Sequence, residues 1–196
     1  MTGIGERLAL VRERIAASCA RAGRDADEVT LVAVSKTHEA SAIREAYAAG
    51  QRVFGENYVK ELADKAEALD DLEGLELHFI GHLQRNKAKA VRRVARVVET
   101  VDSLRLAEAL ERAGGASPLS VFLQVNVAAE AQKSGCTPEA LPELLEAVRA
   151  LPSLRVRGLM TVPPADDDPE ASRRWFRALR TLAKANGLHE LSMGMS

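Results

Sequence analysis

Short apolar runs alternate along this chain with longer charged segments. The first segment places Ile4, Leu8, Val11 and Ile15 at helical spacing, with arginine and glutamate on the other face. Seven apolar runs of strand length follow it: VTLVAVS from Val29, RVFG from Arg52, LHFIG from Leu77, ARVVETV from Ala95, SVFLQVNV from Ser120, RVRGLMTV from Arg155 and HELSMGMS from His189. Seven alternations of strand and helix predict an α/β fold with a parallel sheet, either open and doubly wound or closed into a barrel.

The two sheet architectures differ in where polar residues gather. Each expected strand ends on a polar or chemically capable residue: Lys36, Asn57, His82, Asp102, Asn126, Thr161, and Ser192 or Ser196. In a β/α barrel these ends converge on one mouth, where active sites lie. The pattern therefore favours the barrel, although polar strand ends are also ordinary beginnings of loops.

Length and composition fit one domain over residues 1–196, since 46% of the residues are hydrophobic. The 27 basic and 28 acidic side chains give a net charge of -1, which gives no reason to expect a nucleic acid or an anionic membrane as partner. No apolar run approaches the roughly 20 residues of a membrane span. The N-terminus lacks the apolar core of a signal peptide, and Cys19 and Cys136 read as free thiols. We therefore expect a cytoplasmic protein.

Lys36 is the first candidate for chemistry. It follows an apolar run of the kind that is buried on both faces in parallel sheets. Its ammonium would then lie at the carboxyl edge of the sheet, where α/β folds bind ligands. A partly desolvated lysine loses its proton more readily and can attack a carbonyl to form an imine. The alternative is a surface lysine whose stem packs on the protein while its charge stays in water.

The remaining candidate motifs give weaker indications of function. His78 and His82 would be roughly 13 Å apart on a strand, too far to share a zinc ion, although His82 could still touch a ligand at the strand end. The basic run from Arg85 to Arg96 could bind phosphate or nucleic acid, but without interleaved aromatic residues it reads better as a solvated helix face. The sequence has no glycine-rich GK[ST] phosphate loop and no G-x-S-x-G serine motif.

Six motifs in order resemble one known family. They are VAVSKTH from Val32, FGENYVKE from Phe54, HFIGHLQRNK from His78, LQVNVAAEAQKSG from Leu123, GLMTV from Gly158 and LSMGMS from Leu191. Together they resemble the pyridoxal phosphate homeostasis protein family over nearly the whole chain. Arg85 departs from the pattern, because the family more often has a small residue before Asn86.

The resemblance implies a TIM-like (β/α) barrel of the fold type III found in the N-terminal domain of alanine racemase. It also implies pyridoxal 5′-phosphate (PLP) held as an imine on Lys36, with Ser192 and Ser196 helping to hold the phosphate. The residues it places at the cofactor are Lys36, Asn57, His82, Met160, Thr161, Ser192, Met195 and Ser196.

The function implied is that of a monomeric carrier or buffer of PLP in the cell, with apo-enzymes that use PLP as possible recipients. Alanine racemases add a second domain that brings a catalytic tyrosine, whereas Tyr47 and Tyr58 lie here in helix-like segments. We therefore expect no robust catalysis, since racemisation needs an acid–base group on each face of the substrate carbon. A small racemase-like or decarboxylase-like PLP enzyme is the alternative. A weaker third reading is a barrel that binds nucleic acid or a partner through the basic run.

The sequence ends directly after LSMGMS. In the family that motif is followed by a helix, a further strand and a closing helix, and a β/α barrel needs eight strands. We therefore expect a barrel that lacks its eighth strand and the flanking helices, with open edges on the first and seventh strands. Such a chain should be less stable than the complete barrel and should hold the phosphate of PLP less tightly.

Overall fold

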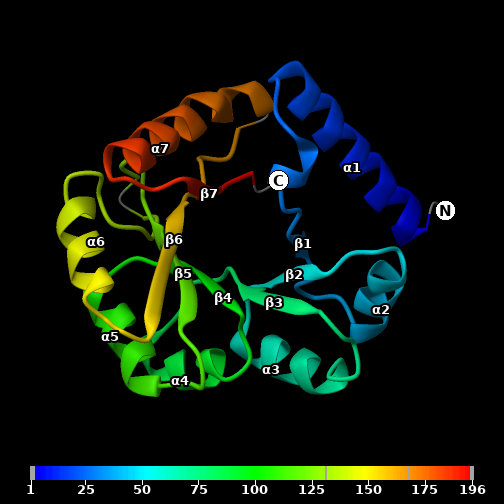
Figure 1. Ribbon diagram of the computed structural model, residues 1–196, viewed down its shortest axis with the longest axis horizontal. Coiled ribbons are helices and arrows are strands. Elements are labelled where there is room, and N and C mark those ends of the chain that lie inside the picture. The colour runs from blue at the N-terminus through cyan, green and yellow to red at the C-terminus, as the bar shows by residue number, and fades with distance from the viewer. Residues whose placement is uncertain (1–2, 131, 167, 195–196) are drawn as a thin grey trace. The chain divides into compact units, whose positions relative to one another are not determined.

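A computed structural model describes residues 3–130, 132–166 and 168–194. It divides into two compact units, one up to His78 and one from Phe79 onward. Within the described ranges, seven strands alternate with helices in the order that the apolar runs predict (Figure 1). Each expected strand is present, so the hydrophobic pattern identified the elements correctly.

Unit 1 carries the first strands and the helices that pack on them. In chain order it contains α1 (Ile4–Arg21), the 3-10 turn η1 (Ala26–Glu28), β1 (Ala33–Val34), α2 (Ala40–Ala48), β2 (Val53–Glu56), α3 (Val59–Ala68) and β3 (Glu76–Phe79), whose last residue begins unit 2. The strands β1 and β2 are parallel, with Ala33 opposite Phe54 and Val34 opposite Gly55. The core of the unit includes Ile43 of α2, Phe54 of β2 and Leu62 of α3.

The first strand is shorter than expected. VTLVAVS predicts a strand from Val29, but ladder pairing is limited to Ala33 and Val34, and one further bond joins Ser35 N–H to the carbonyl of Gly55. The expectation of burial on both faces is also wrong, because Val34 is 46% exposed. The reason is that β1 lies at the edge of the strands of its own unit.

Unit 2 has helices on the outer side of its parallel strands (Figure 1). Its elements are η2 (Arg85–Lys87), α4 (Ala88–Arg92), β4 (Val97–Val101), α5 (Leu104–Ala113), β5 (Leu119–Gln124), α6 (Leu141–Arg149), β6 (Leu154–Met160), η3 (Pro169–Ser172), α7 (Arg173–Ala185) and β7 (Glu190–Ser192). Strand β4 pairs with β5, β5 with β6 and β6 with β7, all in parallel. Apolar side chains of these helices and strands form the core, among them Leu106, Leu110, Val121, Leu141, Val148 and Leu179.

The junction of β6 and β7 depends on a glycine. Gly158 lies opposite Glu190 in the ladder, and a Cβ at this position would overlap the carbonyl oxygen of Glu190. Arg157 donates from Nε and Nη2 to the Glu190 carboxylate at 2.7 and 2.6 Å. The RGL sequence therefore lets β7 approach closely and fixes it with a bidentate ion pair.

The basic run is mainly the outer face of a short helix, as the solvated reading expects. Lys87 and Lys89 are exposed, while Ala88 between them and Val91 on the next turn are buried. Arg92 is the exception, because it is buried and donates from Nη2 to the carbonyl of Ser117. Burial lowers the pKa of the Arg92 guanidinium. None of the helices in the described part of the chain has the length and apolar character needed to cross a bilayer.

Candidate functional site

Lys36 lies in a turn immediately after β1. Ser35 is bonded to β2 through its N–H, and His38 N–H donates to the carbonyl of Ser35 at 3.1 Å, which closes the turn. The residue after Lys36, Thr37, has a φ of 64°, a left-handed backbone conformation that is uncommon for a residue with a β-branched side chain. The Lys36 residue itself is exposed, in contrast to the expectation of a partly desolvated amine, because its strand is itself at an edge and half open to solvent. Its amine is therefore accessible while its backbone is fixed.

Asn57 follows β2, the strand that pairs with β1. Its Oδ1 atom is buried and has no hydrogen-bond partner among the described residues. A buried carbonyl oxygen without a donor is unfavourable, so this atom is available to accept a bond from an added N–H or O–H group. The structure thus brings Asn57 and Lys36 to the carboxyl ends of two adjacent strands.

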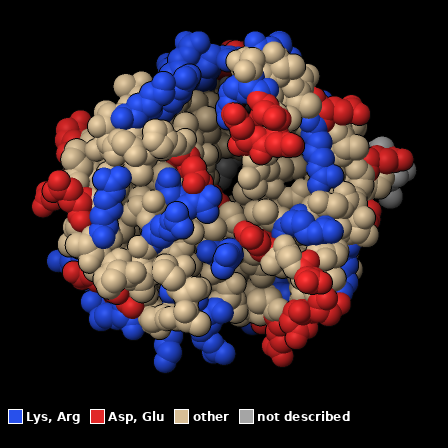
Figure 2. Space-filling model, in the orientation of Figure 1, with Lys and Arg blue, Asp and Glu red and all other residues tan. Residues whose placement is uncertain are grey.

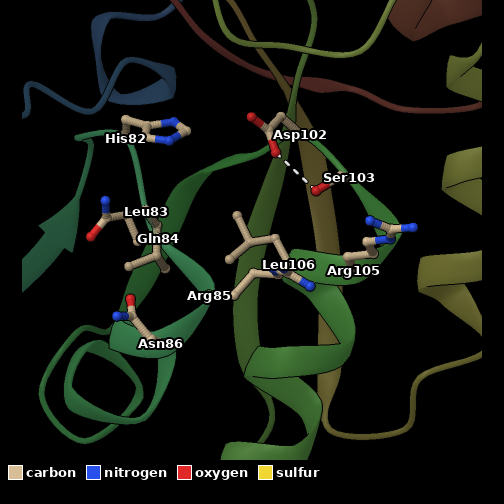
Figure 3. A pocket seen from close by; sticks show the side chains of 9 residues that line it. All are labelled: His82, Leu83, Gln84, Arg85, Asn86, Asp102, Ser103, Arg105 and Leu106. Carbon is tan, nitrogen blue, oxygen red and sulfur yellow. Dashed lines mark hydrogen bonds between the residues drawn. The ribbon is translucent and has the colours of Figure 1, made fainter.

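His82 lines a cavity in unit 2 of about 610 Å³ (Figure 3). The cavity lies between the segment after β3 and the start of α5, and Arg85, Asp102 and Arg105 also line it. His82 Nδ1 is 3.2 Å from the hydroxyl oxygen of Ser134, a residue of the loop after β5. His82 is therefore exposed and lines an open cavity, three residues beyond the end of β3.

Met160 and Thr161 are fully buried at the end of β6. Met160 packs in a cluster with Val97 and Phe122, and both it and Thr161 are 0% exposed. The hydroxyl of Thr161 donates to the carbonyl of Val125 at 2.9 Å, which ties β6 to the residue after β5. In this structure the two side chains form part of the packed interior.

Ser192 is the last residue of β7, and its hydroxyl already has an acceptor. It donates to Oε2 of Glu99, a buried residue of β4, at 2.5 Å. The carbonyl of Ser192 accepts from Thr161 N–H at 3.2 Å, so the structure brings these two expected residues together. Because a hydroxyl has one proton, Ser192 offers a further partner only its lone pairs in this arrangement. Met195 and Ser196 lie outside the described residues.

Sequence reasoning missed a buried group of charges beside Lys36. Glu56 of β2 and Lys65 of α3 form an ion pair at 2.7 Å, with side chains that are 0% and 7% exposed. Glu61 and Lys65 stand four residues apart in a helix-like segment, which is a visible signal for a helical ion pair. Nothing in that spacing reveals that the pair lies inside the protein.

Metal and thiol chemistry find no support in the described residues. No group of three or more histidine, cysteine, aspartate or glutamate side chains among them could hold a metal ion. Cys19 and Cys136 are free, as expected, and burial raises the pKa of the Cys136 thiol to about 11. A thiol with so high a pKa is a poor nucleophile near neutral pH.

Comparisons with known proteins agree in one family. Residues 10–196 match the model of the alanine racemase N-terminal domain. The chain is 49% identical over 200 residues to the pyridoxal phosphate homeostasis protein of Pseudomonas aeruginosa, covering 100% of this chain and 86% of that protein. Identity at this level over the whole chain is strong evidence of common descent.

Solved structures extend the match to the fold. PipY of Synechococcus elongatus, solved without PLP, has a TM-score of 0.85 at 39% identity, covering 98% of this chain and 89% of that one. PipY solved with PLP bound has a TM-score of 0.80 at 38% identity, covering 95% and 89%. These matches confirm the α/β fold class expected from the sequence. The chain belongs to the pyridoxal phosphate homeostasis protein family, whose members have the fold of the alanine racemase N-terminal domain.

Proposed function

We propose that this protein binds PLP covalently through Lys36 and acts as a carrier or buffer of PLP in the cytoplasm. The observation that carries the proposal is the turn after β1, which fixes the backbone on both sides of Lys36 while leaving the residue exposed. The names of the relatives and the PLP-bound form of PipY support the choice of cofactor.

The residues of unit 1 fit such a group. When bound, PLP supplies an aldehyde carbon, which condenses with a primary amine to form a C=N bond and release water. Lys36 provides the amine at the end of β1, and the orphaned Oδ1 of Asn57 at the end of β2 provides an acceptor for a polar hydrogen. An exposed attachment point suits a carrier, because an incoming amine can reach it and take the cofactor away.

On the basis of the family motifs, we propose that His82, Met160, Thr161 and Ser192 of unit 2 also contribute to cofactor binding. Glu99 would then fix the rotamer of Ser192, because its carboxylate accepts a hydrogen bond from the Ser192 hydroxyl. Met195 and Ser196 remain part of the proposal on the basis of the family motif alone.

The contacts of Tyr47 favour a carrier over an enzyme. The hydroxyl of Tyr47 donates to the carbonyl of Glu73 at 2.7 Å, and Arg52 stacks on its ring at 3.8 Å from the centroid. Tyr47 is therefore held in a structural role away from acid–base work. We propose apo-enzymes that use PLP as the recipients and a monomer as the working form.

The deciding experiment compares wild type with Lys36→Ala. Addition of PLP should give wild type a visible absorbance band, and borohydride reduction followed by peptide mapping should place the label on Lys36. The variant should lose both signals, and an unchanged band in Lys36→Ala would overturn the assignment.

The enzyme alternative has its own test. Wild type loaded with PLP should exchange the α-proton of D- or L-alanine in deuterated water no faster than free PLP does. Exchange at enzymatic rates would replace the carrier reading by that of a small racemase-like enzyme.

A further inference from the structure

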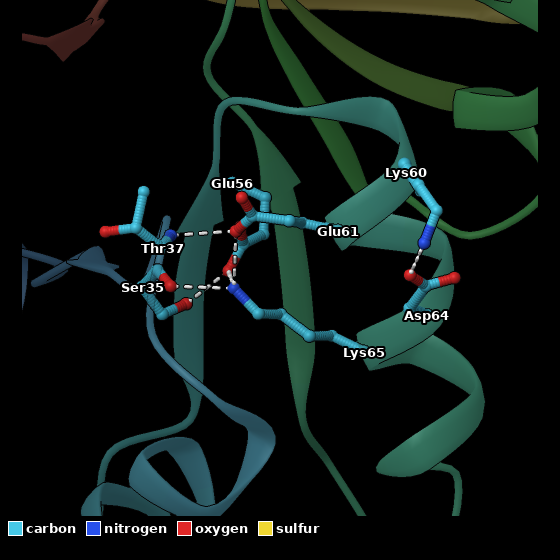
Figure 4. Close-up of polar contacts among 7 residues, drawn as sticks. All are labelled: Ser35, Thr37, Glu56, Lys60, Glu61, Asp64 and Lys65. Carbon is cyan, nitrogen blue, oxygen red and sulfur yellow. Dashed lines mark hydrogen bonds and ion pairs between the residues drawn. The ribbon is translucent and has the colours of Figure 1, made fainter.

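The turn that carries Lys36 is held from both sides by charged groups of β2 and α3 (Figure 4). Before Lys36, the Ser35 hydroxyl donates to Oε1 of Glu56 at 2.6 Å, and Lys65 Nζ donates to the Ser35 carbonyl at 2.7 Å. After Lys36, the N–H of Thr37 donates to Oε2 of Glu61 at 2.8 Å. The two residues that flank the lysine are thus each bonded to a side chain from elsewhere in the unit.

Lys65 joins these contacts into one network. Its ammonium donates to Glu56 Oε1 at 2.7 Å, to Glu61 Oε2 at 3.0 Å and to the carbonyl of Ser35. An ammonium group has three hydrogens, and all three have acceptors here. Because a buried charge is costly unless it is fully paired, the Lys65 side chain has little freedom to move. The positions of Ser35 and Glu61 are therefore coupled.

The backbone at Thr37 indicates that the network holds the turn in a strained conformation. A threonine in the left-handed region is strained, and such conformations persist only where the surrounding structure determines them. Its bond to Glu61 is a contact of this kind, since it fixes the direction of the Thr37 N–H. Without that bond, only the His38 N–H bond to the Ser35 carbonyl is left of the two cited contacts that hold the peptide after Lys36 in this conformation.

We propose that Glu61, fixed by Lys65, is a positioning residue that holds the Ser35–Thr37 turn so that the Lys36 amine is presented in one place. This inference rests on the proposed function and deepens it. Glu61 does not touch the reacting atoms. It reduces the conformational freedom that Lys36 must lose when its amine forms the bond to an aldehyde carbon.

The helix α3 offers matched variants for the test. Glu61→Ala removes the acceptor for Thr37, whereas Glu61→Gln keeps a side-chain oxygen that can still accept from the Thr37 N–H. Asp64→Ala is the control, because Asp64 lies on the same helix and pairs only with the exposed Lys60 among the contacts drawn in Figure 4. The Glu61 side chain is 32% exposed, so its truncation should leave a folded protein, which the thermal midpoint verifies.

The first readout is the binding of PLP. The absorbance of the Lys36 linkage serves as the signal from which the dissociation constant and the association rate are measured. Loss of a charge-assisted hydrogen bond predicts about tenfold weaker binding for Glu61→Ala, with most of the loss in the association rate. Glu61→Gln should recover most of it, and Asp64→Ala should match wild type. A purely structural role for Glu61 would leave the association rate of PLP unchanged, whatever the change in the thermal midpoint.

The second readout needs no cofactor. Hydrogen exchange of the Thr37 amide in PLP-free protein should be faster in Glu61→Ala than in wild type, and unchanged in Asp64→Ala. Wild-type PLP binding by Glu61→Ala would overturn the positioning role, as would failure of Glu61→Gln to recover binding. Neither result touches the attachment of PLP to Lys36, which is tested separately by the absorbance band of Lys36→Ala.

Discussion

Lys65 and Glu56 are charged residues inside the protein, and each depends on the other. Replacing Lys65 by methionine keeps the length of the side chain but leaves the fully buried carboxylate of Glu56 without its cation. Removal of one partner of a buried ion pair typically costs about 3–5 kcal/mol of the free energy of unfolding. We expect Lys65→Met to be destabilised by an amount of this order in urea denaturation.

The control for this prediction is the exposed ion pair on the same helix. Lys60 contacts Asp64 at 2.7 Å, but the Lys60 side chain is 89% exposed. Exposed pairs contribute little because water and salt screen them. Lys60→Met should therefore unfold at the same urea concentration as wild type, and equal losses in both variants would contradict the role of burial.

The sequence pointed to some of the candidate residues and gave no sign of the contacts of others. Lys36 and Asn57 were singled out as candidates because each lies just after an apolar run, and the end of such a run is a local signal. Glu56 and Lys65 were missed because their contact joins β2 to α3, and the identity of a partner nine positions away does not show which groups are buried. The acceptor that Ser192 finds in Glu99 joins residues 93 positions apart and lies still further beyond local reasoning.

At the scale of elements, the junction of β6 and β7 gives a sharp expectation. Gly158→Ala would place a methyl group against the Glu190 carbonyl, and neither backbone can move without breaking the ladder. Overpacking of this kind costs about 1–3 kcal/mol. The thermal midpoint should fall, and hydrogen exchange of β7 should rise. Arg155→Ala, at an exposed position of the same strand, should leave both unchanged.

All charged residues of helix α7 are basic. Its exposed face carries Arg173, Arg174, Arg177, Arg180 and Lys184, and its sequence contains no acidic residue. Figure 2 shows basic side chains in a row over this helix. Like charges three and four residues apart on a helix destabilise it by about 0.2–0.5 kcal/mol per pair.

Reversal of one charge in that row should therefore stabilise the protein. Arg177→Glu replaces repulsion with attraction toward residues on both sides, so the thermal midpoint should rise at low salt. Arg177→Ala should give a smaller rise, because it only removes repulsion. Both gains should shrink in high salt, where exposed charges are screened; a gain that persists there would have another cause.

The boundaries of elements were harder to predict than their order. The first strand begins later than its apolar run because the residues from Val29 follow the turn η1 and have no strand partner until Ala33. Helix α6 begins only at Leu141, although the Thr137 hydroxyl accepts from the Ala140 N–H at 3.3 Å, as the side chain of an N-cap residue would. Pairing and capping depend on neighbours that hydrophobic periodicity does not encode.

At the scale of the whole molecule, acid should affect unit 1 early. The Thr37 N–H, followed by the Lys65 ammonium, holds the pKa of the Glu61 carboxyl below its usual range, and Arg44 does the same for Asp71. Ordinary values for these groups are about 4.3 and 3.9. Because the folded values are lower, both contacts stabilise the unit fully above that range and lose their effect as the pH falls below about 4.

Hydrogen exchange followed by mass spectrometry can locate this effect. On acidification, amides of unit 1 near Thr37 should lose protection first, after correction for the intrinsic rate at each pH, whereas the exposed Arg44–Asp71 pair should contribute less. Glu61→Gln should remove the part of the acid response that belongs to the turn. Simultaneous loss of protection throughout both units would show that these carboxylates do not govern acid unfolding.

The state of the two cysteines has a practical consequence for labelling. Cys19 is shielded from reagents by burial, and burial raises the pKa of the Cys136 thiol to about 11, so Cys136 presents little reactive thiolate near neutral pH. A single cysteine introduced at an exposed position, such as Asp64, should therefore react with a maleimide dye far faster than the native pair. Fluorescent reporters of PLP transfer can then be attached at chosen positions without first removing the natural cysteines.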